Sequence, residues 1–430
     1  MKNLHMKYGT EKLLLSIEQK NIVDTINSNS SQENKSEEDV IVEALTNPIG
    51  TEKLKQLVMK GEKICIIISD ITRAWQKMST FLPYIVNELE HAGIKDEDIV
   101  FLCATGSHRN QSKEEHKILL GDELSKRFSV IDHDSYDDEN MIYLGETSFG
   151  TPVRINKKAM ECDHIIVTGA VVFHDLAGWG GGRKSILPGI AAYETIMANH
   201  ALALSKEGIN PAVRCANGIG NPIHEDMIEA AKMVSPSFLF NVIIDDKGKI
   251  SSAVSGHYIK AHETAQKILD QTDAVYIKEK VDLVIASAGG YPKDINLYQA
   301  SKALSNAKEA VKKGGTIILL SECIEGIGNE DMEEIIKDYT ANKERENFIR
   351  KNFTVSRYIG YMIAEMATQF KIILVSEIDS KVMKKININV LTSIEEALDM
   401  VYKEKGDDVK IYIMPYAAQT LPQIKGAKGN

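Results

Sequence analysis

The sequence has few of the features that mark secreted or membrane-spanning proteins. Its 430 residues contain five cysteines, an odd number, and none of them forms a CxxC pair. Four of the five lie in or beside apolar runs, so we expect buried free thiols in a reducing compartment. No apolar run reaches the ~18 residues that a membrane span requires, and the N-terminus lacks a signal-peptide pattern. These absences predict a cytoplasmic protein that does not cross a membrane.

The sequence also lacks any run rich in Lys and Arg. Acidic residues number 61 against 51 basic ones, which gives a formal net charge of −10. This balance argues against nucleic acid as a general partner. The acidic stretch 132–139 resembles a metal-binding tract but has no recognisable ligand spacing, so we predict a solvated loop there. At 43% hydrophobic and 26% charged residues, the composition is that of an ordinary globular protein.

Continuous apolar runs of strand length recur in the first half of the chain. They comprise 63–69, 98–103 and 164–168, and a stretch with helical spacing at 80–92 separates the first two. Such runs are typical of strands buried on both faces of a parallel sheet. We therefore predict an α/β domain. Polar clusters follow these strands: Asp70, Thr72 and Arg73; His108 and Arg109; and the stretch from His174 to Lys184. Ligands of open α/β sheets bind at that edge, so we expect the clusters to converge there.

The second half repeats the alternation. Apolar runs at 281–287, 316–320, 370–375 and 409–414 are separated by helical stretches, which predicts a second α/β unit with a largely parallel sheet. A length of 430 residues also favours two domains. We expect an N-terminal domain over 1–270, which begins with a β-hairpin around Tyr8-Gly9-Thr10, and a C-terminal domain over 275–412. The tail 415–430 either rejoins the first domain or frays.

The chain is organised around residues 171–200, which read VVFHDLAGWGGGRKSILPGIAAYETIMANH. Four glycines within five positions suggest a backbone that approaches a ligand closely, and the basic pair Arg183-Lys184 suggests that the ligand is anionic. The phosphate loop G-x-x-x-x-G-K-[ST] is matched only in part, because Arg183 stands where its second glycine belongs. A glycine-rich turn with a surface lysine is the plainer alternative.

Five motifs occur together and in matching order over most of the chain: SDITR at 69–73, ATGSHR at 104–109, FHDLAGWGGGRKSILPG at 173–189, NH at 199–200 and GGYPKDINLYQASKA at 289–303. In these the chain resembles the lactate racemase family of nickel-pincer nucleotide enzymes. The resemblance implies two α/β domains, with the active site in the cleft between them. It also implies a racemase or epimerase of a 2-hydroxy acid.

The resemblance implies a cofactor and the residues that hold it. The cofactor is a pyridinium-3-thioamide-5-thiocarboxylic acid mononucleotide, made by other proteins of the cell, which binds nickel through S, C and S. The matching lysine, Lys184, is joined to it through the thioamide, and His200 is the remaining nickel ligand. The loop glycines Gly181 and Gly182 are expected to let the backbone pass close to the ring. Asp70, Thr72 and Arg73 are expected to bind the cofactor phosphate or the substrate carboxylate.

The same resemblance assigns the chemistry. His108 and His174 become a pair of acid–base residues on opposite faces of the substrate, a role that suits imidazole near neutral pH. The substrate hydroxyl loses a proton while the α-hydride moves to the cofactor and later returns to either face. Arg73, Gln299 and Lys302 are expected to bind the substrate. An exposed polar helix face is the alternative for the last two, which are three residues apart.

Several positions differ from the lactate enzymes of the family. Ala74-Trp75 follows Arg73 where a proline is expected, and Phe173 precedes His174 where proline is usual. Trp179 replaces a smaller aromatic residue and Gly180 a serine. Lactate itself is therefore in doubt, and a larger 2-hydroxy acid or a polyhydroxy (sugar) acid is an alternative substrate. A non-catalytic protein that binds the nickel cofactor or a nucleotide, and an ordinary phosphate-loop hydrolase, are alternatives of other classes. The assembly state is open, with a homodimer as one outcome.

Overall fold

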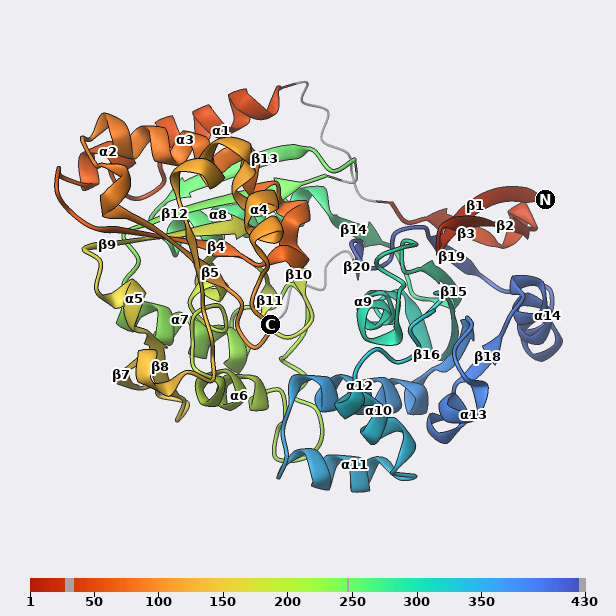
Figure 1. Ribbon diagram of the computed structural model, residues 1–430. Helices are drawn as coiled ribbons and strands as arrows, with labels where there is room; N and C mark the ends of the chain where they lie inside the picture. Colours follow the sequence, from red (N-terminus) through yellow and green to blue (C-terminus); the bar gives the residue numbers. More distant parts are fainter. Residues whose placement is uncertain (28–34, 246, 425–430) are drawn as a thin grey trace. The chain divides into compact units, whose positions relative to one another are not determined.

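The computed structural model describes residues 1–27, 35–245 and 247–424, which form two compact α/β units (Figure 1). The first unit comprises Ser30–Ala203 and Asn210–Gln271, and the second comprises Met1–Asn29, Leu204–Ile209 and Thr272–Asn430. Each unit is built on a six-stranded sheet. The predicted fold class, two α/β domains with largely parallel sheets, is confirmed.

The sheet of the first unit has the order β13-β12-β9-β4-β5-β6, in which only β13 runs antiparallel to its neighbour. Its strands are β4 (Ile64–Ser69), β5 (Ile99–Ala104), β6 (Val130–Asp132), β9 (His164–Ala170), β12 (Phe238–Ile244) and β13 (Ile250–Gly256). The three apolar runs predicted as strands are β4, β5 and β9, which lie side by side at the centre. Central strands covered on both faces have no room for alternating polar residues.

The helices of the first unit are α1 (Glu37–Thr46), α2 (Leu54–Leu57), α3 (Met78–His91), α4 (Lys113–Arg127), α5 (Lys157–Met160), α6 (Tyr193–Ala201), α7 (Pro222–Val234) and α8 (Lys260–Thr272). Side chains of α1, α3 and α4 share one buried core with alternate residues of β4, such as Ile64, Ile66 and Ile68. Two small antiparallel hairpins accompany the sheet: β7 (Met141–Glu146) with β8 (Pro152–Asn156), and β10 (Phe173–His174) with β11 (Gly178–Trp179).

The sheet of the second unit is parallel throughout and has the order β18-β17-β16-β15-β19-β3. Its strands are β3 (Ile22–Thr25), β15 (Val281–Ser287), β16 (Val311–Leu320), β17 (Lys371–Val375), β18 (Asn389–Leu391) and β19 (Ile411–Met414). The helices are α9 (Leu297–Ala307), α10 (Glu330–Lys337), α11 (Asn342–Ile349), α12 (Val355–Gln369), α13 (Ser380–Met383) and α14 (Ile394–Lys405).

The N-terminal segment belongs to the second unit, although the sequence suggested the first. Its hairpin, β1 (Lys2–Tyr8) with β2 (Glu11–Ile17), is present as predicted. Strand β3 then pairs in parallel with β19, and Met6 and Leu15 are buried against the second sheet. The tail also stays with this unit, because β20 (Leu421–Ile424) pairs with β14 (Ala274–Ile277). Both pairings join segments that are far apart in sequence, which local patterns do not reveal.

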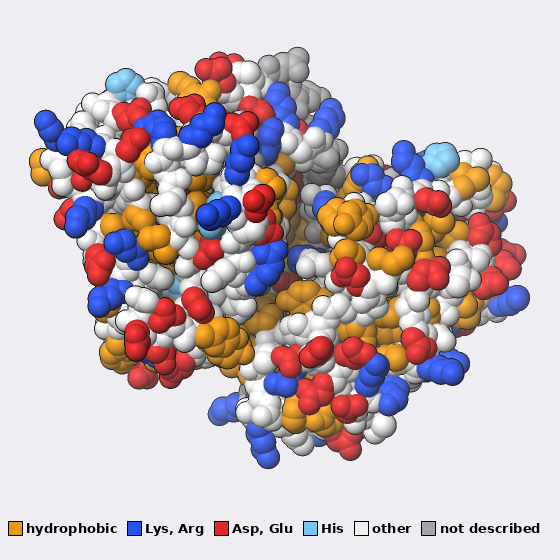
Figure 2. Space-filling view, in the orientation of Figure 1, with side chains coloured by type: hydrophobic (Ala, Val, Ile, Leu, Met, Phe, Trp, Pro, Cys, Tyr) orange, Lys and Arg blue, Asp and Glu red, His pale blue; other side chains and the backbone are white. Residues whose placement is uncertain are grey.

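Charged side chains of both signs are mixed over the surface of each unit that Figure 2 shows. Across the described residues, no helix is both long and apolar enough to cross a bilayer. Cys65, Cys103, Cys162 and Cys323 are free thiols. Cys65, Cys103 and Cys323 are buried as expected, whereas Cys162 and Cys215 are only partly buried.

Candidate active site

The carboxyl ends of β9, β4 and β5 meet at one edge of the first sheet, and the three polar clusters follow these ends. The loop after β5 is tied to the glycine-rich loop after β9, because the amide of Gly106 donates to the carbonyl of Gly189 over 3.0 Å. The loop after β5 is also tied to the one after β4 through His108 and Asp70, whose side chains lie 2.5 Å apart. The predicted convergence of the three clusters is therefore present in the structure.

Asp70 is the centre of the first cluster. Its side chain is buried, and Oδ1 accepts from the amide of Thr72 over 2.9 Å and from its hydroxyl over 2.5 Å. Oδ2 faces Nδ1 of His108. Burial raises the pKa of the Asp70 carboxyl, but the hydrogen bond and charge of His108 outweigh it, so the pKa lies below its usual range. Both oxygens of this carboxylate, and the amide and hydroxyl donors of Thr72, are thus occupied within the protein. Of the cluster's predicted anion-binding groups, only the guanidinium of Arg73 keeps donors beyond its hydrogen bond to Thr72.

A further layer holds the Asp70 loop in place. The side-chain oxygen of Gln111 accepts from the amide of Ile71 over 3.1 Å, and the amide of Gln111 donates to Asp132 over 2.8 Å. The other oxygen of Asp132 lies 2.9 Å from Nε2 of His116. Asp132 begins the acidic stretch that was predicted to be a solvated loop, yet its side chain is largely buried and supports the site.

His174 and Lys184 come together on the glycine-rich stretch. His174 lies on the β10–β11 hairpin, where its Nδ1 faces the amides of Leu176 and Ala177 at 3.2 Å each. Its Nε2 lies 3.1 Å from Nζ of Lys184. The two ring nitrogens of His174 therefore have different surroundings: Nδ1 faces backbone amides of the hairpin turn, and Nε2 faces the Lys184 amine.

Two positions of the loop require glycine, because the backbone there has a positive φ and because neighbouring side chains leave no room for a Cβ. Gly181 and Gly182 have φ values of +71° and +55°, which L-residues with side chains rarely adopt. A Cβ on Gly181 would lie 2.7 Å from Oδ1 of Asn241, and one on Gly182 would lie 2.6 Å from the ring of His262. Asn241 also accepts from the amide of Gly182 over 2.8 Å.

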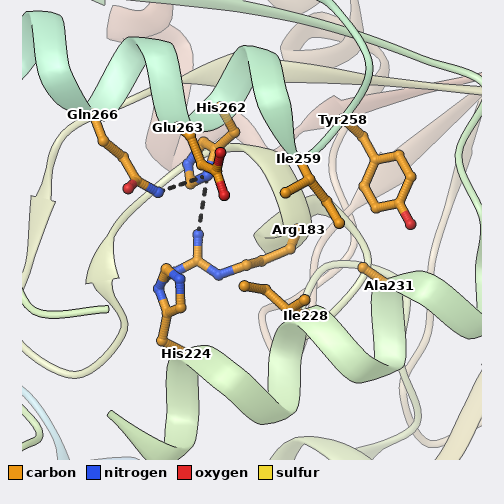
Figure 3. A pocket seen from close by; sticks show the side chains of 9 residues that line it. All are labelled: Arg183, His224, Ile228, Ala231, Tyr258, Ile259, His262, Glu263 and Gln266. Atoms are coloured by element: carbon orange, nitrogen blue, oxygen red, sulfur yellow. Dashed lines mark hydrogen bonds between the residues drawn. The ribbon is translucent and has the colours of Figure 1, made fainter. Parts of the chain in front are cut away.

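Arg183 points away from solvent, between α7 and α8 (Figure 3). Its guanidinium donates to the carbonyl of Ala177 over 2.7 Å and to that of Trp179 over 3.2 Å. It also lies 2.7 Å from Nδ1 of His224 and 3.4 Å from Nδ1 of His262. One buried side chain thus fixes the loop from Ala177 to Arg183.

The charge of Arg183 is not balanced nearby. Within the described part of the chain, no carboxylate comes within 4.0 Å of its guanidinium. Burial lowers its pKa to about 9. Burial, followed by the charge of Arg183, lowers the pKa values of His224 and His262 to about 3, so both rings are neutral at pH 7 and can accept hydrogen bonds.

His200 lies in the last turn of α6 and is 5% exposed. Its Nδ1 bonds to the carbonyl of Ile196 over 2.9 Å, so Nδ1 carries the proton and Nε2 keeps its lone pair. Burial, and then the charge of Lys184, lowers the pKa of His200 to about 3. A neutral imidazole near Lys184 with a free lone pair is the form that binds a metal.

The loop differs from a phosphate loop. Lys184 lies in a single 3-10 turn, η5 (Gly182–Ser185), and the next α-helix begins only at Tyr193. No helix N-terminus stands directly behind the lysine, so the phosphate-loop mechanism has no basis here.

Gln299 and Lys302 lie in the second unit, on α9. Asn296 caps this helix, and Nζ of Lys302 donates to Oε1 of Gln299 over 3.0 Å. The predicted common face is therefore present.

Sequence reasoning missed the side chains that support the loop, namely Asn241, His224 and His262. His224 and His262 lie 41 and 79 residues after Arg183 in the sequence, and Asn241 lies between them. The polar residue within the apolar run of β12 is the one signal that marked Asn241.

The comparisons with known proteins agree with this geometry. Residues 8–210 match the family model described as the lactate racemase N-terminal domain, and residues 276–420 match the lactate racemase C-terminal domain. The chain is 35% identical to a lactate racemase of Thermoanaerobacterium thermosaccharolyticum, over 99% of this chain and 100% of that protein. It is 33% identical to one of Lactiplantibacillus plantarum, over 88% and 89% of the two proteins.

A solved structure also matches. The lactate racemase apoprotein from Thermoanaerobacterium thermosaccharolyticum superposes with a TM-score of 0.90 at 33% identity, over 98% of this chain and 100% of that one. A protein of Thermotoga maritima shares the fold at 19% identity with a TM-score of 0.66. The matches in sequence and structure extend over both units, and the chain therefore belongs to the lactate racemase family and is an isomerase, a racemase.

Proposed function

We propose that the protein racemises or epimerises a 2-hydroxy acid, with a nickel-pincer nucleotide joined to Lys184. The observation that carries this proposal is the 3.1 Å approach of the Lys184 amine to Nε2 of His174. It puts an attachment point and an acid–base group together at the ligand-binding edge of the sheet. A second imidazole, that of His108, is oriented by Asp70 at the same edge.

The residues present fit such a cofactor. His200 offers one neutral nitrogen donor near Lys184. In the described ranges, no three His, Cys, Asp or Glu side chains gather into a metal site. A nickel ion held here would therefore need further donors that the protein does not supply, and a sulfur-bearing nucleotide supplies them. Gly181 and Gly182 allow the loop that carries the lysine to pack closely against Asn241 and His262.

The bound cofactor would supply a site that takes up the substrate α-hydride and returns it. The protein's own contribution is proton transfer. Nδ1–H of His108 donates a hydrogen bond to the Asp70 carboxylate. Nε2 of His108 therefore keeps its lone pair and can accept the proton of the substrate hydroxyl. Attachment through the amine would remove the ammonium charge beside His174, which is the proposed acid–base group for the opposite enantiomer. Arg73 offers a fork that matches a carboxylate.

The direct test is racemisation by protein produced together with the cofactor-synthesising proteins. Pure enantiomers of lactate, 2-hydroxybutyrate, malate and a sugar acid would be incubated with it and separated by chiral chromatography. We expect at least one 2-hydroxy acid to lose optical purity, and no loss with Lys184→Ala. Protein that carries the cofactor yet racemises none of them would support the non-catalytic alternative instead.

A further inference from the structure

A small cavity between α7 and α8 surrounds the buried side chain of Arg183. Figure 3 shows this side chain between His224 of α7 and His262 of α8. The cavity lies wholly within the first unit, and its apolar lining includes Ile228 of α7 and Ile259, directly before α8. Its volume is about 20 Å³, which is enough for one species of about the size of a water molecule.

The guanidinium of Arg183 has donors that the protein does not satisfy. Nη2 has the carbonyls of Ala177 and Trp179 as acceptors. Nη1 has only Nδ1 of His262 at 3.4 Å, and that nitrogen already accepts from Nε2 of Gln266 over 3.0 Å. Among the described residues, Nε has no acceptor, although Arg183 is only 4% exposed. A buried donor without an acceptor is destabilising, so we expect a further acceptor in the cavity.

The charges around the cavity also favour an anion. Burial is the cause that lowers the pKa of Arg183, and no acidic side chain of the described residues counteracts it. Glu263 lines the cavity too, but its side chain is exposed. His262 and Glu263 belong to the first turn of α8, and the N-terminal end of a helix carries a partial positive charge. A buried cation in such surroundings is stabilised most effectively by a counter-ion.

We propose that the cavity beside Arg183 binds a monatomic anion, such as chloride, as the counter-ion of this side chain. The ion would accept hydrogen bonds from the guanidinium donors that the protein leaves unsatisfied. The cavity is too small to enclose a sulfate, a phosphate or a carboxylate group. The bound ion would stabilise the loop from Ala177 to Arg183, which directly precedes Lys184. It takes no part in racemisation, so the site is independent of the proposed function.

Thermal unfolding of the protein produced without cofactor tests this site. Sodium chloride would replace sodium gluconate stepwise at constant ionic strength, so that screening by salt stays the same. We expect the melting temperature to rise by about 2–4 °C once chloride exceeds its dissociation constant severalfold, because a ligand of the folded state stabilises it. Equal melting temperatures in the two salts would overturn the proposal.

Two substitutions in α7 separate the site from a general effect of chloride. Ala230 and Ala231 are both fully buried, but of the two only Ala231 lines the cavity. Ala231→Val should fill the cavity and abolish the response to chloride. Ala230→Val adds the same two methyl groups elsewhere and should keep the response. Equal responses of the two variants would contradict the site.

Glu263→Gln tests whether the exposed carboxylate, rather than an ion from solution, compensates Arg183. We expect the variant to bind chloride more tightly than the wild type, because a repelling charge at the cavity is removed. A response to chloride in Glu263→Gln alone would show instead that Glu263 is the counter-ion of the wild type.

Bromide locates the ion directly. Crystals of the wild type grown with bromide in place of chloride should show an anomalous difference peak beside Arg183, and crystals of Ala231→Val should lack it. A wild-type cavity without such a peak would show that water, rather than an anion, satisfies the guanidinium, and would overturn the proposal.

Discussion

Nδ1 of His108 lies 2.5 Å from Oδ2 of Asp70, and the carboxylate is held in turn by Thr72. This arrangement fixes the proton of His108 on Nδ1, because an ionised carboxylate only accepts. Asp70→Asn would remove that preference. We expect a loss in kcat of about 10²- to 10⁴-fold, the usual range of general acid–base assistance.

The double variant makes this prediction sharper. Residues that act as a unit are strongly non-additive, so Asp70→Asn combined with His108→Ala should be no slower than His108→Ala alone. Rates that multiply in the double variant would show that Asp70 acts independently of His108, for example on the substrate itself.

Both candidate bases are expected to be necessary in both directions. His108→Ala and His174→Ala should each reduce racemisation by about 10²- to 10⁴-fold from either enantiomer. The cofactor content, measured from the intact mass, should remain near that of the wild type. A variant that keeps its full activity from both enantiomers would contradict the two-base scheme.

Acid should destabilise the first unit through its buried histidines. Burial lowers the pKa of His133 from 6.5 to about 4 in the folded protein, where its ring bonds to Asn156 and to the carbonyl of Ala191. The unfolded chain binds this proton more readily, so the contribution is complete above pH 6.5 and is lost as the pH falls towards 4. A shift of this size corresponds to about 3 kcal/mol.

The measurement is the free energy of unfolding between pH 7.5 and 4.5. His133→Gln should flatten the pH dependence over this window, at the cost of some stability at pH 7.5. An unchanged slope in the variant would show that other groups account for acid unfolding.

The glycine loop offers a matched pair of substitutions. Gly182→Ala places a Cβ 2.6 Å from the ring of His262 at φ +55°, whereas Gly220→Ala has a similar φ of +75° and open space around it. The strain of a positive φ is common to both, and only the first adds a clash. We expect Gly182→Ala to lower the free energy of unfolding by about 1–3 kcal/mol more than Gly220→Ala. Equal losses would mean that the loop shifts to accommodate a side chain.

The sequence predicted the parts of the fold that depend on local pattern. The apolar runs of β4, β5 and β9 are distinctive because central parallel strands are buried on both faces. The short β10–β11 hairpin was missed, since two-residue strands carry no periodicity.

The site was predictable where motifs exist and not where partners come from distant segments. His108, His174 and Lys184 stand within recognisable motifs, and the structure brings each beside another predicted residue. The support of Arg183 by His224 and His262 depends on how α7 and α8 pack, which no spacing in the sequence encodes.

Covalent attachment of the cofactor at Lys184 is the central claim, and intact-mass spectrometry of protein produced with the cofactor-synthesising proteins tests it most directly. The wild type should carry an adduct with the mass of the nucleotide, and peptide mapping should place it on Lys184. Lys184→Ala should lack the adduct, while the control Lys158→Ala, an exposed lysine of α5, should keep it. An adduct that persists in Lys184→Ala would contradict the account.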